Sequence, residues 1–571
     1  MRKFALKLAL LKKLFFAFII ITAWALPALA QQKKPAKIII EHTDFIDHNQ
    51  TEIPGAVILT GNVQVFHDGV RITCNKIYQY ESENYIKAFG NVKMNQGDTI
   101  FMDSKYAEYN GDKKFAFASG GVNMRSPDMR LVTDTVYFDR NIQQAYYNSN
   151  GTIYSGENTL KSKQGRFYVK EKKYNFLTAV TLTNPQYVMK SNHLDYYTNS
   201  GHSYVFGPTT ITGKKDFIYT EKGFYDTKKN LATLLTNSYI KYDTQIIRGD
   251  SLYYDRNRNF SSATNNVKVT DTVNKFLVTG HYAEVYRAKD SLFVTKHALA
   301  VTLVENDSLY THAKRMVVTG KPGSRVIRGY NDARFYKTDM SGKCDSIHSN
   351  ELTGLTQLIK RPVVWNGESQ VTGDVIHLIS NSKTQQLDSI KVLTNAFIIQ
   401  QDTIWSYKNP AKPRFSQIKG VNLYGKFRDN KLYEIDLVKN TEKVYYMYDS
   451  DNELIGIDKG VSSKIHIELE DNQINTVTSM IKPESSSYPE KDLPENARKL
   501  RGFLWRGDER IRSKEDIFPQ DEKDLDAAIV KKTTTNKKAE DTPMEIKKET
   551  LDYDKNNPKP KTPVAPQDSG Q

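Results

Sequence analysis

Residues 59–65 read Leu-Thr-Gly-Asn-Val-Gln-Val and residues 88–94 read Ala-Phe-Gly-Asn-Val-Lys-Met, so one pattern returns after 29 residues. A third copy, Ala118-Ser119-Gly120-Gly121-Val122, keeps nearly the same spacing, and later copies weaken, as in Ala263-Thr264-Asn265-Asn266-Val267. Self-similarity at a fixed period of 20–50 residues is typical of repeat architectures. The chain is therefore predicted to contain about a dozen units of roughly 29 residues.

Two landmarks follow this period. An aromatic residue usually followed by Asp, Asn or Glu recurs, as in Tyr80-Glu81, Tyr109-Asn110 and Tyr225-Asp226. Independent landmarks that share one period over several hundred residues indicate a genuine repeat. The other landmark is the aliphatic residue that ends the pattern, and its copies are Val63, Val92, Val122, Ile153, Leu182, Ile211, Ile240, Val267, Val301, Phe335, Val364 and Val392.

Each unit has the composition of β-strands. Segments such as Lys275-Phe276-Leu277-Val278-Thr279 are rich in β-branched and aromatic residues, with apolar and polar positions alternating. Gly, Asn and Asp predict turns at Asn110-Gly111-Asp112, Gly120-Gly121 and Asn265-Asn266. A unit of this length cannot bury its apolar face alone, so neighbouring units must stack. The predicted fold class is all-β, an elongated β-jellyroll or β-solenoid.

The N-terminus has the features of an export signal. Residues 1–30 contain five basic residues, the apolar stretch Leu14–Trp24 and the cleavage pattern Ala28-Leu29-Ala30. An uncleaved anchor is the alternative, but the apolar run is short for a bilayer span of about 20 residues. Removal of the signal peptide lowers the formal net charge from +15 to +10, because 76 Lys and Arg then face 66 Asp and Glu. These charges are interspersed, which fits an anionic ligand or membrane surface better than nucleic acid.

The remaining chain divides by composition. Residues 31–400 hold the repeats, and residues 401–482 are expected to form a further β module or terminal rungs. Residues 483–518 read as a linker followed by an aromatic segment, which we expect to cap the last rung rather than dock on a partner. Residues 519–571 are rich in Lys, Asp and Pro and are expected to be disordered.

No catalytic constellation is apparent. The sequence has no Gly-x-Ser-x-Gly elbow, P-loop or His-Glu-x-x-His helix, and its eleven His are scattered. The recurring Asp and Asn could suggest calcium or a glycosidase, but they follow an aromatic once per repeat, where a turn needs a side chain that bonds its own backbone. Cys74 and Cys344 lie far apart in the repeat order, so we expect two separate buried thiols rather than a disulfide. No enzyme activity, cofactor or metal is predicted.

The aliphatic stripe has two interpretations. It is a packed core if the folded sheet closes tightly, or the wall of an acyl-chain trough if the sheet gapes along one side. In the second case basic residues at the rim would meet anionic head groups, and the candidates are Lys87, Lys93, Arg125, Arg130, Lys190 and Arg248. The candidate lipid-groove residues are Val63, Val92, Phe101, Val122, Leu131, Ile153, Leu182, Ile211, Ile240 and Val267.

The Gly-Asn-Val strands at 59–65 and 88–94, with the strands that follow at 72–78 and 101–107, resemble the OstA/LptA family. The resemblance implies a periplasmic β-jellyroll whose open lengthwise groove carries the lipid A part of lipopolysaccharide. It also implies similar jellyroll partners at the inner and outer membranes, and end-to-end self-association. The likeness is best over 38–300, and this chain is much longer than the short bridging members.

These observations lead to one main functional hypothesis and two alternatives. The main hypothesis is a periplasmic lipopolysaccharide carrier or bridge, associated with the outer membrane and working without catalysis. The second is an interaction scaffold or surface adhesin with a dry core. The third, a β-helical carbohydrate-active enzyme, would need a cluster of Asp, Arg or Lys that breaks the repeat, and the sequence shows none.

Overall fold

The computed structural model describes residues 37–49, 51, 53–304, 307–384, 386–429, 431–470, 473–524 and 526–528. The predicted signal peptide and residues 529–571 lie outside this part of the chain. The chain forms two compact units. Of the described residues, the first comprises those up to Thr264 with Lys268–Val273 and Val285–Ala288, and the second comprises Asn265–Val267, Asn274–Glu284 and those from Lys289 onward.

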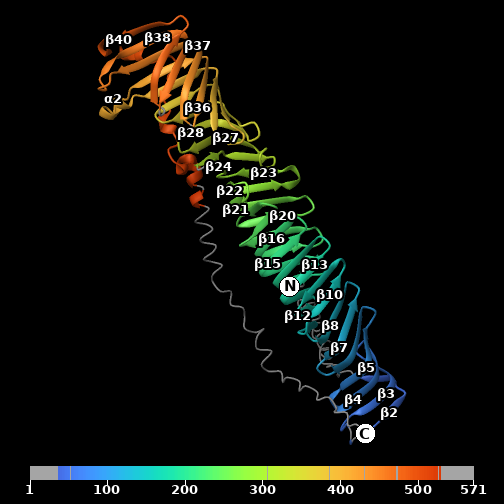
Figure 1. Cartoon of the computed structure of the whole chain (residues 1–571). Helices are drawn as coiled ribbons and strands as arrows, with labels where there is room; N and C mark the ends of the chain where they lie inside the picture. The colour runs from blue at the N-terminus through green and yellow to red at the C-terminus, as the bar shows by residue number, and fades with distance from the viewer. Residues whose placement is uncertain are drawn as a thin grey trace, which may run out of the picture. The chain divides into compact units, whose positions relative to one another are not determined.

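The prediction of an all-β fold is confirmed, and the described strands of each unit pair in antiparallel fashion (Figure 1). The first unit contains β1 (Ile39–His42), β2 (Phe45–Asp47), β3 (Val57–His67), β4 (Val70–Tyr80), β5 (Tyr85–Gln96), β6 (Ile100–Asn110), β7 (Phe115–Ser126), β8 (Met129–Asp139), β9 (Gln144–Tyr147), β10 (Gly151–Ser155), β11 (Asn158–Ser162), β12 (Gln164–Tyr168), β13 (Lys173–Asn184), β14 (Tyr187–Tyr197), β15 (His202–Gly213), β16 (Asp216–Asp226), β17 (Leu231–Thr236), β18 (Tyr239–Tyr242), β19 (Gln245–Arg248) and β20 (Ser251–Asp255).

Two strands, β21 (Phe260–Asp271) and β22 (Phe276–Tyr286), contribute residues to both units. The second unit contains the short helix α2 (Thr403–Lys408). Its strands are β23 (Ser291–Thr295), β24 (Leu299–Val304), β25 (Asp307–His312), β26 (Arg315–Thr319), β27 (Val326–Lys337), β28 (Met340–Asn350), β29 (Leu355–Ile359), β30 (Val363–Asn366), β31 (Ser369–Thr372), β32 (Val375–Ser380), β33 (Leu387–Leu393), β34 (Ala396–Gln401), β35 (Phe415–Gly420), β36 (Asn422–Arg428), β37 (Lys431–Tyr448), β38 (Leu454–Glu470), β39 (Gln473–Met480) and β40 (Glu484–Tyr488).

Each early repeat is a hairpin of two long strands rather than a set of short ones. The strands β5 and β6 pair from Tyr85 opposite Asn110 to Gln96 opposite Ile100, with one interruption between Phe89 and Val92. Side chains alternate between the buried and the outer face along both strands, as a period of two requires. Each repeat therefore adds two strands to the stack, a distance of about 9–10 Å.

The interruption explains the Gly-Asn pattern. Gly90 and Asn91 have φ values of 70° and 47°, and the register of β5 shifts at this point against both neighbouring strands. Such left-handed residues form a bulge that bends the strand, and Gly and Asn adopt this conformation most readily. Gly120-Gly121 and Asn265-Asn266 were expected at turns, but the structure places them inside β7 and β21 as bulges of this kind.

The aromatic landmark with its following Asp, Asn or Glu does mark the turns. The side chain of Asn110 accepts a hydrogen bond from the backbone of Lys113 at 2.8 Å, and Asp226 and Asp255 accept equivalent bonds from Lys228 and Arg258. The interpretation of these residues as turn formers is confirmed.

The bulges continue beyond Val392, where the sequence pattern fades. Left-handed pairs occur there at Thr394-Asn395, Lys439-Asn440 and Ile481-Lys482. These residues share backbone conformation with Gly90-Asn91 but not composition, so the repeat is invisible in the sequence there. The described residues after 400, of which 401–482 were expected to form a further β module or terminal rungs, belong to the second unit.

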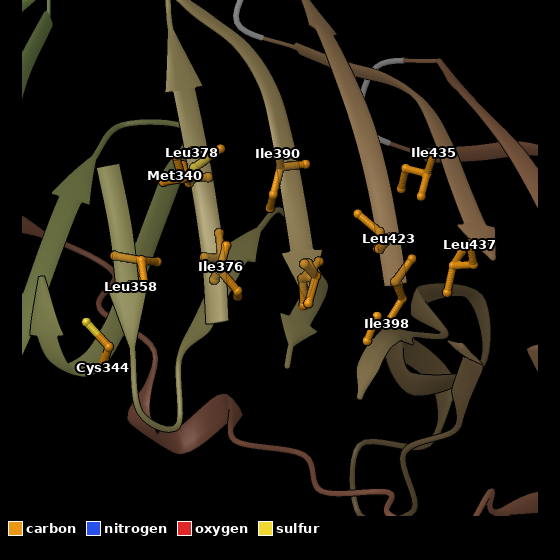
Figure 2. Packing of buried hydrophobic residues seen from close by; sticks show 14 of the residues in the cluster. Met340, Cys344, Leu358, Ile376, Leu378, Ile390, Ile398, Leu423, Ile435 and Leu437 are labelled. Atoms are coloured by element: carbon orange, nitrogen blue, oxygen red, sulfur yellow. The ribbon is translucent and has the colours of Figure 1, made fainter. Parts of the chain in front are cut away.

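Aliphatic ladders form the core of the second unit. Leu358 pairs with Ile376, Ile376 with Val392, and Val392 with Leu423, so one apolar row crosses four neighbouring strands. Figure 2 shows Leu358, Ile376 and Leu423 on three of these four strands within this cluster. The regular spacing places each side chain directly over its neighbour, which is the main stabilising contact in a sheet.

Residues 489–528, which we call the C-terminal strap, run back along the second unit (Figure 1). The strap contains η4 (Glu490–Asp492), η5 (Glu495–Arg498), η6 (Gly507–Glu509) and η7 (Lys514–Ile517), and it follows β40, which pairs with β38. Buried Gln417 donates to Arg498 O and accepts from Leu500 N, both at 2.9 Å. Buried Gln370 binds Leu504 O and Arg506 N in the same way at 2.8 and 2.7 Å.

The strap differs from the expected organisation. Residues 483–518 were expected to be a linker and a cap on the last rung, yet the segment extends over many strands because buried amides bind its main chain along the way. Residues 520–524 and 526–528, placed in the expected disordered tail, are helical. Phe518 stacks on His297 with ring centroids 3.6 Å apart.

Candidate functional site

The bends divide each unit's strands into two facing arms. In the early repeats the first arm holds halves such as 85–89 and 106–110, and the second arm holds 92–96 and 100–104. Because each strand bends near its middle, both rows of turns lie along one side, which we call the mouth. The row of bulges lies on the other side, which we call the corner.

A cavity of about 60 Å³ with largely apolar walls lies between the arms of β5–β12. Its second-arm wall carries Met94, Met102, Met124 and Met129, and Met94, Met102 and Met124 lie directly opposite one another on consecutive strands. Its first-arm wall carries Ala116, Ala118, Ala145, Phe138 and Phe167. Flexible thioether side chains therefore face small methyl groups. Unbranched methionine side chains adapt to irregular spaces more readily than branched ones.

A larger cavity of about 220 Å³ lies in the second unit. Its walls include Phe276, Phe335, Met340 and Leu378, of which Met340 and Leu378 are visible in Figure 2. Charged groups of both signs also line it: Arg325, Lys337, Asp339 and Glu351. The Arg325 guanidinium lies 4.5 Å from the centroid of the Phe276 ring, and Lys337 Nζ lies 3.0 Å from Asp339 Oδ1.

Nine of the ten candidate groove residues lie inside the sheet but outside both cavities. Leu131, Ile153, Leu182, Ile211 and Ile240 belong to one continuous ladder, and all are at most 3% exposed. Val63, Val92, Val122 and Val267, at most 2% exposed, follow the bulges. The structure places Phe101 on the outer face, 38% exposed, because it alternates with buried Met102 along β6.

The six candidate rim charges are also displaced. Lys87, Lys93, Arg125, Arg130, Lys190 and Arg248 alternate with buried neighbours and so lie on the outer faces of their strands. Charges at the mouth come from the turns instead. The Arg140 guanidinium donates to Asp68 O at 3.0 Å, and the Arg287 guanidinium lies 3.3 Å from Asp243 Oδ2.

The methionines of the cavity wall were not predicted as site residues, although the sequence contained a signal for them. Met94 and Met124 each stand two residues after the aliphatic landmark, where period two returns the chain to the inner face. Four of the chain's eleven methionines fall between residues 94 and 129. That local concentration was the available clue.

Beyond β12 the first unit's interior contains tyrosine. One row of directly opposed first-arm residues reads Ala116, Phe138, Ala145, Phe167, Tyr174, Tyr196, Ser203, Tyr225, Ala232 and Tyr254. The same row also contains Tyr109 of β6, directly opposite Ala116, so it carries no hydroxyl group only from Ala116 to Phe167. Tyr174, Tyr196, Tyr225 and Tyr254 are at most 3% exposed, and burial raises the pKa of Tyr174 and Tyr225, so these hydroxyls stay neutral.

Both cysteines have a structural position at the corner. Cys74 and Cys344 are unpaired and buried, as expected, and each Sγ donates to the carbonyl two residues ahead, Lys76 O at 3.4 Å and Ser346 O at 3.2 Å. The Ser162 hydroxyl makes the same contact with Gln164 O. Burial raises the pKa of the Cys74 thiol to about 11 and that of Cys344 to about 12. Neither is a reactive thiolate near neutral pH.

One group in the described chain has the composition of a metal site: Glu434, Asp436 and His466. Its members already form ion pairs with each other and with nearby lysines. His466 Nδ1 lies 2.8 Å from Asp436, Lys464 Nζ lies 2.9 Å from Asp436, and Lys426 Nζ lies 2.9 Å from Glu434. Cross-strand ion pairs on a sheet face account for this arrangement. Among the described helices, none is both long and apolar enough to cross a bilayer.

Comparison with known proteins bears on the methionine-lined part of the chain. A family model described as OstA-like protein matches residues 35–192, which contain the whole cavity between β5 and β12. No curated protein matches the chain. The N-terminal repeats of this chain, residues 35–192, are therefore similar to the OstA-like family, as their Gly-Asn-Val strands indicated.

Proposed function

We propose that this protein is an exported carrier that holds the acyl chains of lipopolysaccharide between the arms of its bent sheet. The observation that carries the proposal is the apolar cavity between β5 and β12, inside the segment that matches the OstA-like family. The carrier would work in the periplasm without catalysis. Its expected partners are similar jellyrolls at the inner and outer membranes.

The cavity's chemistry fits saturated chains. Its walls offer methyl, thioether and phenyl groups, so a bound chain gains apolar contact without leaving polar groups unpaired. Methionine adapts to chains that lie in different positions. The mouth gives a chain access from one side, while turn charges such as Arg140 remain near the head group.

Site-specific photocrosslinking tests this proposal. Photoreactive residues at Met102 and Met124 should label with the lipid A part of added lipopolysaccharide. The matched controls are Phe101 and Arg125, the sequence neighbours on the outer face. Equal labelling at inner and outer positions would contradict the proposal.

A cavity-filling variant gives an independent test. Ala116→Leu adds bulk to the cavity wall and should reduce labelling at Met102, whereas Ser119→Leu on the outer face of β7 should leave it unchanged. Undiminished labelling in Ala116→Leu would place the lipid elsewhere.

A scaffold or surface adhesin is the second candidate, and the fully buried ladder through Leu182, Ile211 and Ile240 favours it. Such a ladder is an ordinary core. Protease treatment of intact cells separates the two functions, because an adhesin is cleaved from outside and a periplasmic carrier is protected.

A further inference from the structure

The two arms of the first unit touch directly near its N-terminal end, where the His67 and Tyr109 rings lie 5.3 Å apart, and they touch again beyond β12. Tyr187, at the start of β14 in the second arm, packs on Tyr225, at the end of β16 in the first arm, with ring centroids 5.0 Å apart. Tyr242 and Tyr254 repeat this contact between β18 and β20, with centroids 6.2 Å apart. All four side chains are at most 4% exposed. Aromatic rings therefore cross the space that remains open between β5 and β12.

An ion pair fastens this section at the mouth. Arg256, in the turn after β20, places Nη1 3.1 Å from Asp216 Oδ1 and Nη2 2.9 Å from Asp216 Oδ2. The Tyr254 hydroxyl donates to Asp216 Oδ2 at 2.7 Å. The Arg256 and Asp216 side chains are 11% and 6% exposed, so the pair is largely shielded from water.

A glycine and two aromatic rings surround this ion pair closely. A Cβ on Gly213 would lie 2.1 Å from Asp216 Oδ1 and 2.3 Å from Arg256 Nη1, so only glycine leaves room there. The guanidinium also lies 5.2 Å from the centroid of the Tyr187 ring and 5.6 Å from that of Tyr254. The ion pair and the aromatic contacts form one connected fastening.

We propose that Asp216, Arg256 and Tyr254 close the interior of the first unit to acyl chains beyond β12, so that these residues determine how much of the sheet accepts lipid. The inference rests on the proposed lipid-carrier function. Chains bind in the methionine-lined section, and they enter the tyrosine section only when Asp216 separates from Arg256. The first unit thus holds a compartment of limited length rather than a continuous conduit.

The test maps where a chain lies in the full-length protein. A C16 fatty acid with a diazirine at its methyl end is photolysed with the purified chain, and the labelled peptides are identified by mass spectrometry. In the wild type, label is expected within residues 94–169 and only at background within residues 187–254. In Arg256→Gln, label within 187–254 should rise by roughly tenfold.

Two further variants test whether the change in labelling comes from this ion pair. Tyr254→Phe keeps the ring but removes the hydroxyl that binds Asp216, so it weakens the fastening in a sheet that stays packed, and it should also raise label within 187–254. Arg258→Gln is the matched control, because Arg258 is 69% exposed and lies two residues from Arg256, and its labelling should equal that of the wild type.

The outcomes separate the two proposals. Label within both sections of the wild type overturns the closure and leaves the carrier function standing. Label within neither section overturns the carrier function itself. Confinement to residues 94–169 in both folded Arg256→Gln and Tyr254→Phe overturns the role of this fastening.

Discussion

In the first unit, arginines from the turns of one arm reach aspartates in the turns of the other, as Arg256 does with Asp216 and Arg287 with Asp243. In the second unit, the C-terminal strap runs along the strands and is held through the buried amides of Gln417 and Gln370. The two units use the same bent strands and the same left-handed bulges. The two units differ in which contacts hold the bent sheet: ion pairs between the arms in the first unit, and the strap in the second.

The place of fastening affects the interior. Contacts that cross the interior fill it, as Tyr187 and Tyr225 do in the first unit. The strap anchors Gln417 and Gln370 lie apart from the walls of the second unit's cavity, which keeps a volume of about 220 Å³. A bent antiparallel sheet can therefore be a packed core or a container, depending on which residues hold its arms.

The largest expected effect on stability comes from removing the Asp216–Arg256 ion pair of the first unit. Asp216→Ala leaves the Arg256 guanidinium buried without its partner, and it should lower the free energy of unfolding by about 3–5 kcal/mol. Hydrogen exchange of β14–β20 reports this loss locally. The matched control is Asp243→Ala, because Asp243 is 79% exposed, and it should cost less than about 1 kcal/mol. Equal losses of unfolding free energy in the two variants would mean that burial does not distinguish the two ion pairs.

A smaller effect is expected when the strap loses one anchor. Gln417→Leu leaves Arg498 O and Leu500 N without their side-chain partner, and unsatisfied buried groups cost about 1–3 kcal/mol. Trypsin should cleave faster at Lys499 and Arg501, while hydrogen exchange of β5–β8 in the first unit stays unchanged. Gln520→Leu, at an exposed strap position, serves as the control. Wild-type cleavage rates in Gln417→Leu would show that this amide does not anchor the strap.

Much of the fold could be predicted from sequence because the repeat places the same residue types at the same backbone positions. Asp226 was correctly expected at a turn, whereas Gly120-Gly121, also expected at a turn, forms a bulge inside β7. The repeat was lost where Lys439-Asn440 and Ile481-Lys482 adopt the same left-handed backbone, since tertiary contacts impose there a conformation that composition does not suggest. The strap was also missed, because its anchors Gln370 and Gln417 lie more than a hundred and about eighty residues before the groups that they bind.

The candidate site was harder to predict than the fold. The aliphatic landmark identified inward positions such as Val92 and Leu182, but full burial shows these to be core. A cavity depends on the sizes of residues that face each other across the arms, as Met102 and Ala118 do, and no single-sequence pattern relates them. Phe101 was misplaced by one residue, and a shift of one residue along a strand moves a side chain to the opposite face.

The smallest effect concerns pH and the far end of the strap, where His312 is fully buried beneath Phe518 and Glu522. His312 Nδ1 donates to Ala298 O at 2.8 Å, and burial lowers the pKa of His312 to about 4. Arg334, Asp332 and His297 are the other titratable groups close enough to influence it.

A histidine with a lowered pKa contributes stability above its ordinary pKa of about 6.5, and this stability is lost as pH falls toward 4. Between pH 7.5 and 5.5 the expected loss is about 1.4 kcal/mol, or roughly tenfold in the population of the released strap end. Burial raises the pKa of Glu522, whose contribution has the opposite sign and is lost as pH rises. The protection factors of residues 517–524, which are exchange rates corrected for the intrinsic rate at each pH, should therefore fall at pH 5.5, and more steeply in Glu522→Gln. His312→Gln should remove this dependence, while the protection factors around Gln417 stay constant in all three proteins. A pH response that survives in His312→Gln would assign the titration to another group.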